Sequence, residues 1–437
     1  MRYFGPKTAA YYKRMHEALF ATTVDDYRPV IKSADGIWVT DLDGNKFLDF
    51  TSQVGIINTG HNPEEVVSAI REQATLATGM ITNDFQFSST HKFSSLKHEE
   101  VSPVRLAEEL IRLTPVPHPK KVLFEVSGAT AINAATKICL AASPGKKKFL
   151  AFKKAFHGRH GPSLDLSSSK EVHKLLHQPG LDVLRIEFPS RGTPFKLYME
   201  ALVHELDRWE TSLNAIFVEI VQGEGGINIP ELKILNFLRR EAKKRGFIFV
   251  VDEVQTGLGR TGKLFASEYL NSPPDVLVLS KSLGAGVPIG AVVARTDILP
   301  AGDLTQGAHS GTMPASPLAC AAAFTTLKLL EESRLVEKGE ILGKYLLEGL
   351  HEVIDGHPAI VDIDSLGGLM IRMEFASKSF CEEVILECLS QEPGLLLIEA
   401  GDKTIRFMPP LSVSREEIDL ALEILDRALE RLNQPLG

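Results

Sequence analysis

Short apolar runs alternate with segments of helical spacing through the middle of the chain. The unbroken apolar run Phe247–Val251 is typical of a strand that is buried on both faces. Before it, Leu235–Arg245 has helical spacing and ends at Gly246, a common residue after a helix. Further strands are expected at 122–126, 149–152, 215–220 and 276–279, and a further helix at 131–142. This alternation predicts βαβ units and an α/β fold with a mostly parallel sheet.

The two ends of the chain have a different pattern. Residues 35–50 predict a hairpin with a turn at Asp43-Gly44. The last third predicts a smaller α+β domain, with a helix over Pro317–Leu330 and a final helix from the capping-box residues Ser414 and Glu417 to about Leu432. Strands are expected there at 369–375, 395–399 and 404–408. Residues 83–100 have no periodicity and predict a long loop near a functional site.

Composition narrows the class of protein. A hydrophobic fraction of 44% and a charged fraction of 24% are typical of a soluble globular chain. The net charge of -8 argues against a nucleic-acid binder. The first residues lack the apolar core of a secretory signal, and no apolar run has the length of a membrane span. Four widely spaced cysteines form neither a metal pattern nor a disulfide framework, so we expect a cytoplasmic protein without a metal site.

One nucleotide-binding motif is present but is rejected. The segment Gly257–Lys263 fits the pattern GxxxxGK. Leu264 follows it, where a phosphate-binding loop needs the hydroxyl of Ser or Thr for Mg²⁺. The acidic pair Asp252-Glu253 also leads directly into this loop, whereas a phosphate-binding loop takes its acidic residue from a later strand.

Lys281 and Asp252 are the residues that point to chemistry. Lys281 follows the strand 276–279, at the edge where α/β sheets place ligands, and desolvation there lowers the pKa of an amine and makes it a nucleophile. Asp252 ends the buried strand 247–251, where a carboxylate is costly unless it meets a cation such as a pyridinium N–H. The alternatives are that Lys281 is a solvated lysine at the end of a strand and that Asp252 is a core aspartate bonded to backbone amides.

Two segments resemble one known family. Val251–Gly262, with the sequence VDEVQTGLGRTG, is similar to the signature of class III (omega) aminotransferases, and Leu279–Gly290 is similar to the lysine segment of that family. The resemblance runs in order from about Gly36 to Pro410. It implies a pyridoxal-phosphate (PLP) enzyme of fold type I and a homodimer with shared active sites. The implied domains are a large PLP-binding domain over residues 66–325 and a small domain from residues 1–65 and 326–437.

The resemblance also implies roles for individual residues toward the cofactor. Lys281 would carry PLP as a Schiff base, and Asp252 would pair with its ring nitrogen. Val254 and Phe156 would pack on the two ring faces, and Gln255 would contact the ring hydroxyl. The other cofactor-binding residues that it implies are His157, the phosphate-binding turn Ser127, Gly128 and Ala129, and Thr312, which would reach the phosphate of the neighbouring subunit.

The substrate end of the predicted site has counterparts in the family as well. Arg406 resembles an arginine that binds an α-carboxylate, and Glu224 resembles the carboxylate that pairs with this arginine when it is not bound to substrate. Arg159 resembles a second carboxylate anchor, and Glu219 matches the preceding acidic position. Val54 stands where relatives that transaminate ornithine carry Tyr, which favours an ω-amino acid with a carboxylate.

The chain departs from the family pattern at two places. Thr130 and Asn133 replace acidic residues after the phosphate-binding turn, where backbone amides still suit a phosphate. After Thr312 the chain has Met313–Pro317 in place of the usual Phe-Gly-Gly-Asn-Pro, and Pro314 removes an N–H. A different path of this loop would affect the contact with the neighbouring subunit.

The sequence thus predicts an aminotransferase that moves an amino group from an ω-amino acid such as 4-aminobutyrate to 2-oxoglutarate. An amino-acid racemase or epimerase on the same fold needs the same Lys281 and Asp252 and remains an alternative. A non-catalytic relative is the third possibility, and the intact set of Lys, Asp, Gln and Arg residues argues against it.

Overall fold

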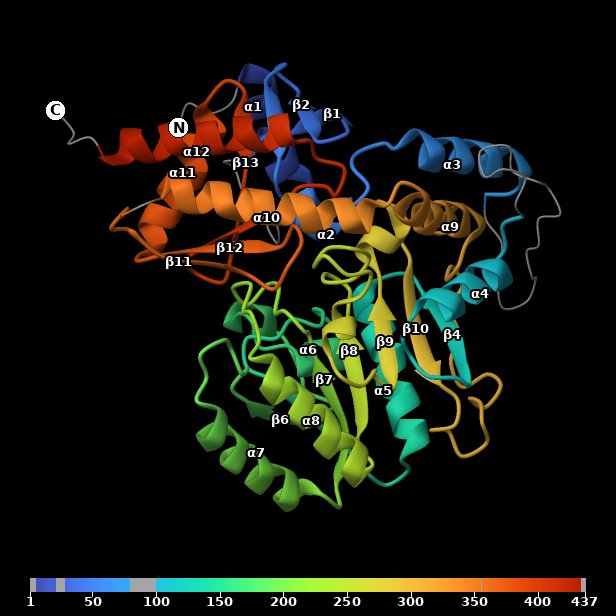
Figure 1. Cartoon of the computed structure of the whole chain (residues 1–437). Coiled ribbons are helices and arrows are strands. Elements are labelled where there is room, and N and C mark those ends of the chain that lie inside the picture. Colours follow the sequence, from blue (N-terminus) through green and yellow to red (C-terminus); the bar gives the residue numbers. More distant parts are fainter. Residues whose placement is uncertain (1–4, 21–27, 79–99, 355, 434–437) are drawn as a thin grey trace.

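The middle of the chain forms a seven-stranded sheet in the computed structural model, which describes residues 5–20, 28–78, 100–354 and 356–433 (Figure 1). Its spatial order is β4 (Lys120–Glu125), β10 (Gly290–Arg295), β9 (Val276–Leu279), β8 (Ile248–Asp252), β7 (Leu213–Val218), β5 (Lys148–Phe152) and β6 (Asp182–Ile186). Strands β9, β8, β7, β5 and β6 pair in parallel, whereas β10 is antiparallel to both of its neighbours. The predicted α/β fold with a mostly parallel sheet is therefore confirmed.

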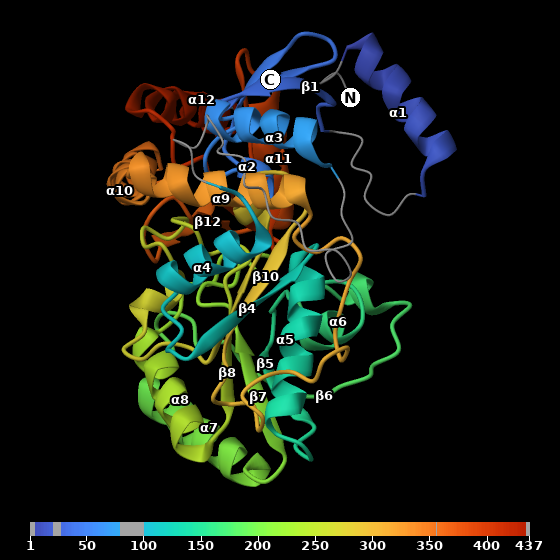
Figure 2. The same ribbon diagram turned by 90° about the vertical axis from the view of Figure 1, so that its right-hand side faces the viewer.

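Successive residues of the central strands alternate between two hydrophobic cores. Phe217 and Val250 pack with the apolar face of helix α5 (Gly128–Ala142), and their neighbours Ile216 and Val251 pack with helices on the other face. Figure 2 shows α5 on one side of the sheet, with α7 (Phe195–Trp209) and α8 (Leu232–Arg245) on the opposite side. Both faces of each central strand are thus covered, which explains the unbroken apolar runs in the sequence.

The other helices around this sheet differ in length, and α7 and α8 are the longest of them. They are α4 (Pro103–Leu113), α6 (Pro162–Leu166), α7 (Phe195–Trp209), α8 (Leu232–Arg245) and the 3-10 turns η2 (Glu171–Lys174), η3 (Ala266–Tyr269) and η4 (Lys281–Gly284). Helix α8 ends where the sequence predicts, because Gly246 has a φ of 67° and its N–H bonds the last turn.

Two four-stranded sheets form the other half of the molecule, which holds both ends of the chain (Figure 1). The first has the order β1 (Ile31–Asp35), β2 (Trp38–Asp41), β3 (Lys46–Asp49) and β13 (Gly394–Leu396). The second has the order β11 (Ile360–Ser365), β12 (Ile371–Phe375), β15 (Thr404–Phe407) and β14 (Ile398–Ala400). The parallel pairing of β3 with β13 joins the N-terminal hairpin to the C-terminal part of the chain.

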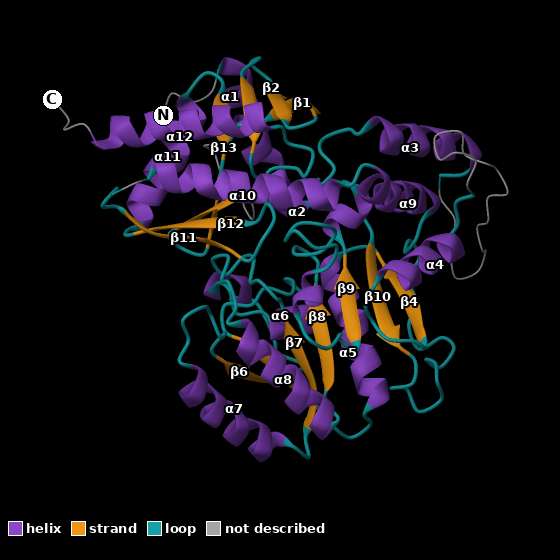
Figure 3. Cartoon of the chain, viewed as in Figure 1, coloured by secondary structure: helices purple, strands orange, loops and turns teal. Residues whose placement is uncertain are grey.

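Figure 3 shows how helices line this half of the molecule. Its helices are α1 (Pro6–Ala18), α2 (Ser52–Gly55), α3 (Glu64–Leu76), α9 (Pro317–Glu332), α10 (Leu335–Val353), α11 (Lys378–Ser390) and α12 (Arg415–Asn433). Helix α12 begins with the predicted capping box, since the N–H of Ser414 donates to Glu417 and the N–H of Glu417 donates to Ser414.

The structure corrects one predicted strand and adds others. Residues 395–399 are not one strand, because the chain passes from one small sheet to the other at Leu397, between β13 and β14. The sequence analysis did not identify β1, β6, β10 and β11. The predicted long loop at 83–100 lies outside the described residues, apart from Glu100. The domain boundaries at 65/66 and 325/326 stay predictions.

A buried ion pair ties α8 to the start of β9. Arg239 donates from Nη1 and Nη2 to the two carboxylate oxygens of Asp275, both at 3.0 Å, and Arg295 donates to Oδ1 at 2.8 Å. The Arg239 and Asp275 side chains are only 3% and 7% exposed. Removal of the carboxylate would leave a buried cation without its partner.

We expect Asp275→Ala to lower the free energy of unfolding by about 3 to 5 kcal/mol, because it breaks this buried pair on one side. The exposed Asp402 offers a control, and Asp402→Ala should change the free energy by less than about 0.5 kcal/mol. Urea titrations followed by circular dichroism measure both values. Equal losses in the two variants would contradict the structural role of Asp275.

Candidate active site

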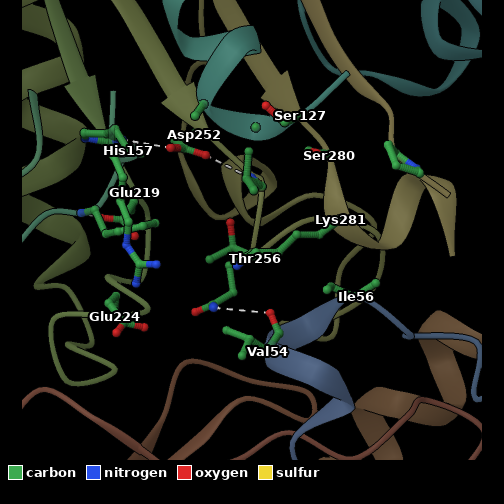
Figure 4. Close-up of a pocket in the computed structure, with 18 of the residues that line it drawn as sticks. Val54, Ile56, Ser127, His157, Glu219, Glu224, Asp252, Thr256, Ser280 and Lys281 are labelled. Atoms are coloured by element: carbon green, nitrogen blue, oxygen red, sulfur yellow. Dashed lines mark hydrogen bonds and ion pairs between the residues drawn. The ribbon is translucent and has the colours of Figure 1, made fainter. Parts of the chain in front are cut away.

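The parallel strands of the large sheet end at one edge, and the segments after them carry the predicted site residues. Ser127 follows β4, Glu219 follows β7, and Lys281 follows β9, while Asp252 is the last residue of β8. A cavity of about 700 Å³ lies at this edge (Figure 4). The predicted residues that line it are Val54, Ser127, Gly128, Ala129, Phe156, His157, Arg159, Glu219, Glu224, Asp252, Val254, Gln255, Lys281 and Arg406. Its volume is in the range of small-molecule sites.

Asp252 has two hydrogen-bond donors at the inner end of the cavity. Its Oδ2 lies 2.8 Å from Nδ1 of His157, and its Oδ1 accepts from the N–H of Val254 at 3.0 Å. Burial alone would lower the pKa of His157, but the hydrogen bond and charge of Asp252 outweigh it and raise this pKa. Figure 4 shows the two side chains facing each other. Asp252 is therefore held by an imidazole as well as a backbone amide.

Glu219 lies beside this pair as a second buried carboxyl group. Its oxygens accept from the N–H groups of Phe156 at 3.0 Å and Gly223 at 3.2 Å. Burial, with a further contribution from the charge of Asp252, raises the pKa of Glu219 to about 7, although His157 and both amides oppose the shift. Near neutral pH, this group thus holds a proton for a large part of the time.

Lys281 approaches the cavity from the short turn η4, with a φ of 46°. Burial is the largest cause that lowers its pKa to about 8, and the positive charge of Arg406 adds to it. The carboxylates Glu224, Asp252 and Glu219 partly oppose this shift. An amine with this pKa is neutral, and hence nucleophilic, in a substantial fraction near pH 8.

Arg406 and Glu224 form an ion pair across the cavity. Nη2 of Arg406 donates to Oε2 of Glu224 at 3.0 Å and to the carbonyl oxygen of Glu399 at 2.8 Å. The Nε and Nη1 atoms of Arg406 are buried and have no partner among the residues that the structure describes. Burial would raise the pKa of Glu224, but Arg406 lowers it below its usual value, with a smaller contribution from Lys170. The unpaired nitrogens suit a carboxylate ligand.

The turn after β4 offers backbone amides to an anion. Ser127 caps helix α5 in a capping box with Thr130, whose hydroxyl accepts from the N–H of Ser127 at 3.1 Å. Thr130 stands where the family pattern has an acid, and its hydrogen bond with Ser127 stabilises the start of the helix. The N–H groups of the first helical turn have no acceptor within the helix, which leaves Gly128 and Ala129 suited to bind a phosphate.

Gly128 is required here by close packing rather than by its φ. A Cβ atom at Gly128 would lie 2.9 Å from Cγ1 of Val254, which lines the cavity next to the turn. Asn133, the second departure from the family pattern, accepts from the N–H of Ser163 at 2.8 Å. Neither departure removes a backbone amide from the phosphate-binding turn.

Two residues that the sequence analysis missed, Lys170 and His173, contact residues that line the cavity. The ring of Phe156 packs edge-on against His173 at 5.7 Å between centroids, and the guanidinium of Arg159 lies 5.5 Å from the same ring. Nζ of Lys170 lies 3.7 Å from Oε1 of Glu224. No motif marks Lys170 or His173, although both follow the Phe156–Arg159 segment closely. Ile56 and Ile398 line the cavity itself and were not predicted.

Val54 lies on a turn with an unusual backbone. Ser52, Gln53, Val54 and Gly55 have φ values of 44°, 52°, 64° and 79°, so the helix α2 is a left-handed turn. Left-handed conformations cost about 1 to 2 kcal/mol per non-glycine residue and are especially unfavourable for a β-branched side chain. The carbonyl oxygen of Val54 lies 3.4 Å from Nε2 of Gln255, a contact that is dashed in Figure 4.

Thr312 is the predicted residue that does not line this cavity. It is exposed on the loop that leads to α9, and Ala315 on the same loop has a φ of 52°. The contact of Thr312 with the phosphate of a neighbouring subunit stays a prediction.

Known proteins resemble this chain over nearly its whole length. The family model of class III aminotransferases matches residues 19–429. An ornithine aminotransferase 2 of Staphylococcus aureus is 33% identical over 405 residues, which cover 90% of this chain and 92% of the relative. A 5-aminovalerate aminotransferase of Pseudomonas aeruginosa is 30% identical over 437 residues, covering 96% and 98% of the two chains. The chain belongs to the class III aminotransferases.

Solved structures show the same fold. An ornithine aminotransferase from Toxoplasma gondii superposes with a TM-score of 0.84 at 26% identity, covering 97% of this chain and 95% of that one. A transaminase from the marine bacterium Virgibacillus has a TM-score of 0.86 at 25% identity, covering 98% and 100%. These enzymes confirm fold type I, and the family depends on PLP.

The residues of the cavity fit this cofactor. Nε2 of His157 and Oε1 of Gln255 are buried without a partner in the described parts of the chain, as are the two Arg406 nitrogens. Phe156 and Val254 offer apolar walls, and the phosphate-binding turn offers amides. Within the described residues, no group of three potential ligands could hold a metal ion, and no helix has the length and apolar character to cross a membrane.

We expect Lys281 of the apoprotein to react with an amine-specific reagent in a pH profile with a midpoint near 8, because only the neutral amine is nucleophilic. Peptide mass spectrometry after brief labelling would measure the rate. The exposed Lys378 on α11 provides the internal control for reagent concentration and labelling time. A midpoint for Lys281 at the ordinary lysine value of about 10.4 would refute the lowered pKa.

Proposed function

We propose that this chain transfers the amino group of an ω-amino acid that carries a carboxylate, such as 4-aminobutyrate, to 2-oxoglutarate. The observation that carries this proposal is one cavity that combines Lys281 and Asp252 with the ion pair of Arg406 and Glu224. Amine chemistry and carboxylate recognition thus share one site. The similarity to aminotransferases of ornithine and 5-aminovalerate, whose substrates have a terminal amine, supports the same class of donor.

Bound PLP supplies an electron-accepting ring that stabilises negative charge on the substrate carbon next to the nitrogen. Asp252 is the partner for the ring nitrogen, and His157 holds that carboxylate in place. Val254 and Phe156 would enclose the ring, and Gln255 would contact the ring hydroxyl. The N–H groups of Gly128 and Ala129, with the hydroxyl of Ser127 at the same turn, would bind the phosphate.

Lys281 has two tasks in this proposal. Its Nζ would hold the cofactor covalently at rest and would be a free amine while the donor is bound. The freed amine then takes a proton from the substrate carbon that carries the nitrogen and returns it at the next stage as a general acid. A pKa near 8 suits this exchange, because neither protonation state is strongly favoured around neutral pH.

Glu224 and Arg406 distinguish the two halves of the reaction. While an ω-amino acid is bound, Glu224 neutralises Arg406 at 3.0 Å. When 2-oxoglutarate enters, its α-carboxylate takes the guanidinium, and Glu224 turns toward Lys170, which already lies 3.7 Å from its other oxygen. Arg159, beside the ring of Phe156, binds the second carboxylate. Val54 leaves room for an aliphatic chain at this end.

Ornithine is the second candidate donor, because the staphylococcal relative at 33% identity is an ornithine aminotransferase. Val54 favours 4-aminobutyrate, since the resemblance places Tyr there in relatives that transaminate ornithine. A homodimer completes the proposal, with Thr312 from each subunit at the phosphate of its neighbour.

With 2-oxoglutarate as acceptor, wild-type protein should transaminate 4-aminobutyrate or 5-aminopentanoate faster than ornithine. Val54→Tyr should shift this preference toward ornithine, and Lys281→Ala should lower kcat at least about 1000-fold. Glutamate formation under saturating PLP measures all three. Lys281→Ala protein that turned over at the wild-type rate would contradict the assigned role.

The same assay separates the racemase alternative. Without any 2-oxo acid, a transaminase stops after one half-reaction. Chiral chromatography of single amino-acid enantiomers incubated in this way should therefore show no racemisation. Continuous racemisation without an acceptor would exclude the proposed function.

Arg406→Gln should raise the KM for 2-oxoglutarate by about 10- to 100-fold, because a hydrogen-bonded charge to the α-carboxylate is lost. The KM for the ω-amino acid should change much less, since Glu224 neutralises Arg406 in that half-reaction. Arg427→Gln, on the exposed face of α12, is the matched control. An equal rise in both KM values would refute the switch between Glu224 and substrate.

A further inference from the structure

Arg260 belongs to the glycine-rich segment Gly257–Lys263, which the proposed chemistry does not use. Its side chain is 0% exposed, and no carboxylate within the described ranges forms an ion pair with it. A buried cation without a carboxylate is unfavourable unless hydrogen bonds replace its water. The partners of Arg260 therefore indicate what the residue is for.

Four hydrogen bonds join Arg260 to two other parts of the chain. Nη1 donates to the carbonyl oxygens of Leu369 at 2.8 Å and Pro409 at 2.6 Å, both in the C-terminal part. Nη2 donates to Oγ of Ser52, the first residue of the left-handed turn, at 3.2 Å and to Oδ1 of Asn58, which follows the turn, at 2.6 Å. One guanidinium thus links three segments that are far apart in the sequence.

The glycines of this segment allow the close contact. A Cβ atom at Gly368 would lie 2.2 Å from the backbone nitrogen of Gly262, so the two backbones touch directly. Asn58 in turn donates from Nδ2 to the carbonyl oxygen of Leu258 at 2.9 Å. The segment docks on protein at a place where a phosphate-binding loop would need open space.

Asp49 holds the left-handed turn from its other side. Its Oδ1 accepts from the N–H of Thr51 at 2.9 Å, and its Oδ2 accepts from Nε2 of Gln53 at 3.1 Å. Ser52 also donates to the carbonyl oxygen of Met408 at 2.6 Å. A turn with three successive non-glycine residues of positive φ would relax toward ordinary backbone if these contacts were lost.

The held turn places Val54 at the cavity. The Val54 side chain lines the wall, and its carbonyl oxygen meets the amide of Gln255. The next residue, Gly55, packs closely against its surroundings, because a Cβ atom there would lie 3.1 Å from Cε of Met408. A small movement of the turn would therefore change the depth of the pocket at Val54.

We infer that Arg260 is a positioning residue for donor selection, which holds the turn Ser52–Gly55 left-handed and so sets how far Val54 reaches into the pocket. Selection by donor length rests on the proposed function. The holding of the turn is a property of the protein itself and can be measured without turnover.

The experiment compares the wild type with Arg260→Lys, which keeps the charge but cannot reach all four acceptors, and with the milder Ser52→Ala. The exposed Arg240 on α8 supplies the matched control, Arg240→Lys. Hydrogen exchange of peptides covering residues 50–58 should become about 10-fold faster in both test variants. Peptides of β7 and β8 should be unchanged, and the control should match the wild type.

The second readout is the ratio of kcat/KM for 5-aminopentanoate to kcat/KM for 4-aminobutyrate, two donors that differ by one methylene. A receding Val54 should shift this ratio toward the longer donor by about fivefold in both test variants. A merely structural Arg260 would lower the melting temperature and scale both donors equally. An unchanged ratio in folded variants, or unchanged exchange at residues 50–58, would overturn the inference.

Failure of a variant to fold and failure of the proposed function can each be told apart from failure of this inference. If Arg260→Lys fails to fold, Ser52→Ala decides the question alone, because it removes the hydroxyl that bridges Arg260 and Met408. If the wild type transaminates neither donor, the proposed function fails, and donor selection fails with it. The exchange of residues 50–58 still decides whether Arg260 holds the turn.

Discussion

The carboxylate of Asp252, at the buried end of the central strand β8, is the constraint on which the site depends. A buried carboxylate is unfavourable unless donors surround it, and here His157 and the N–H of Val254 supply them. His157 can reach Asp252 because β5 and β8 run in the same direction in the sheet, so that their ends lie at one edge. The parallel topology thus decides which residues become partners of this group.

Charge balance around the cavity extends this argument. Lys281 and Arg406 lie among the carboxyl groups of Asp252, Glu219 and Glu224, and charges in this group help to set the pKa values of Lys281, Glu219 and Glu224. The result is an amine with a pKa near 8 beside a carboxyl group with a pKa near 7. Groups of this kind are suited to proton transfer near neutral pH, which is the property that a transaminase needs.

Substrate recognition comes from parts of the chain outside the large sheet. Val54 reaches the cavity from the N-terminal turn and Arg406 from β15, so the pocket is complete only where three segments meet. Arg260 lies at that meeting point, where hydrogen bonds to the N-terminal and C-terminal segments take the place of carboxylate partners. The rejected nucleotide-binding motif therefore has a structural explanation, because its glycines allow backbones to pack rather than a phosphate to bind.

The sequence by itself determined the α/β class and the strand ends at Asp252 and before Lys281, because apolar runs depend on neighbours along the chain, and its resemblance to class III aminotransferases indicated many of the residues that line the cavity. It missed β10 and β6, and it merged β13 with β14, since pairing between distant strands leaves no local pattern. Tertiary structure alone decided the roles of Lys170, His173 and Arg260, and the left-handed turn at Val54. These depend on contacts across long sequence separations, where packing overrides the preference of each residue.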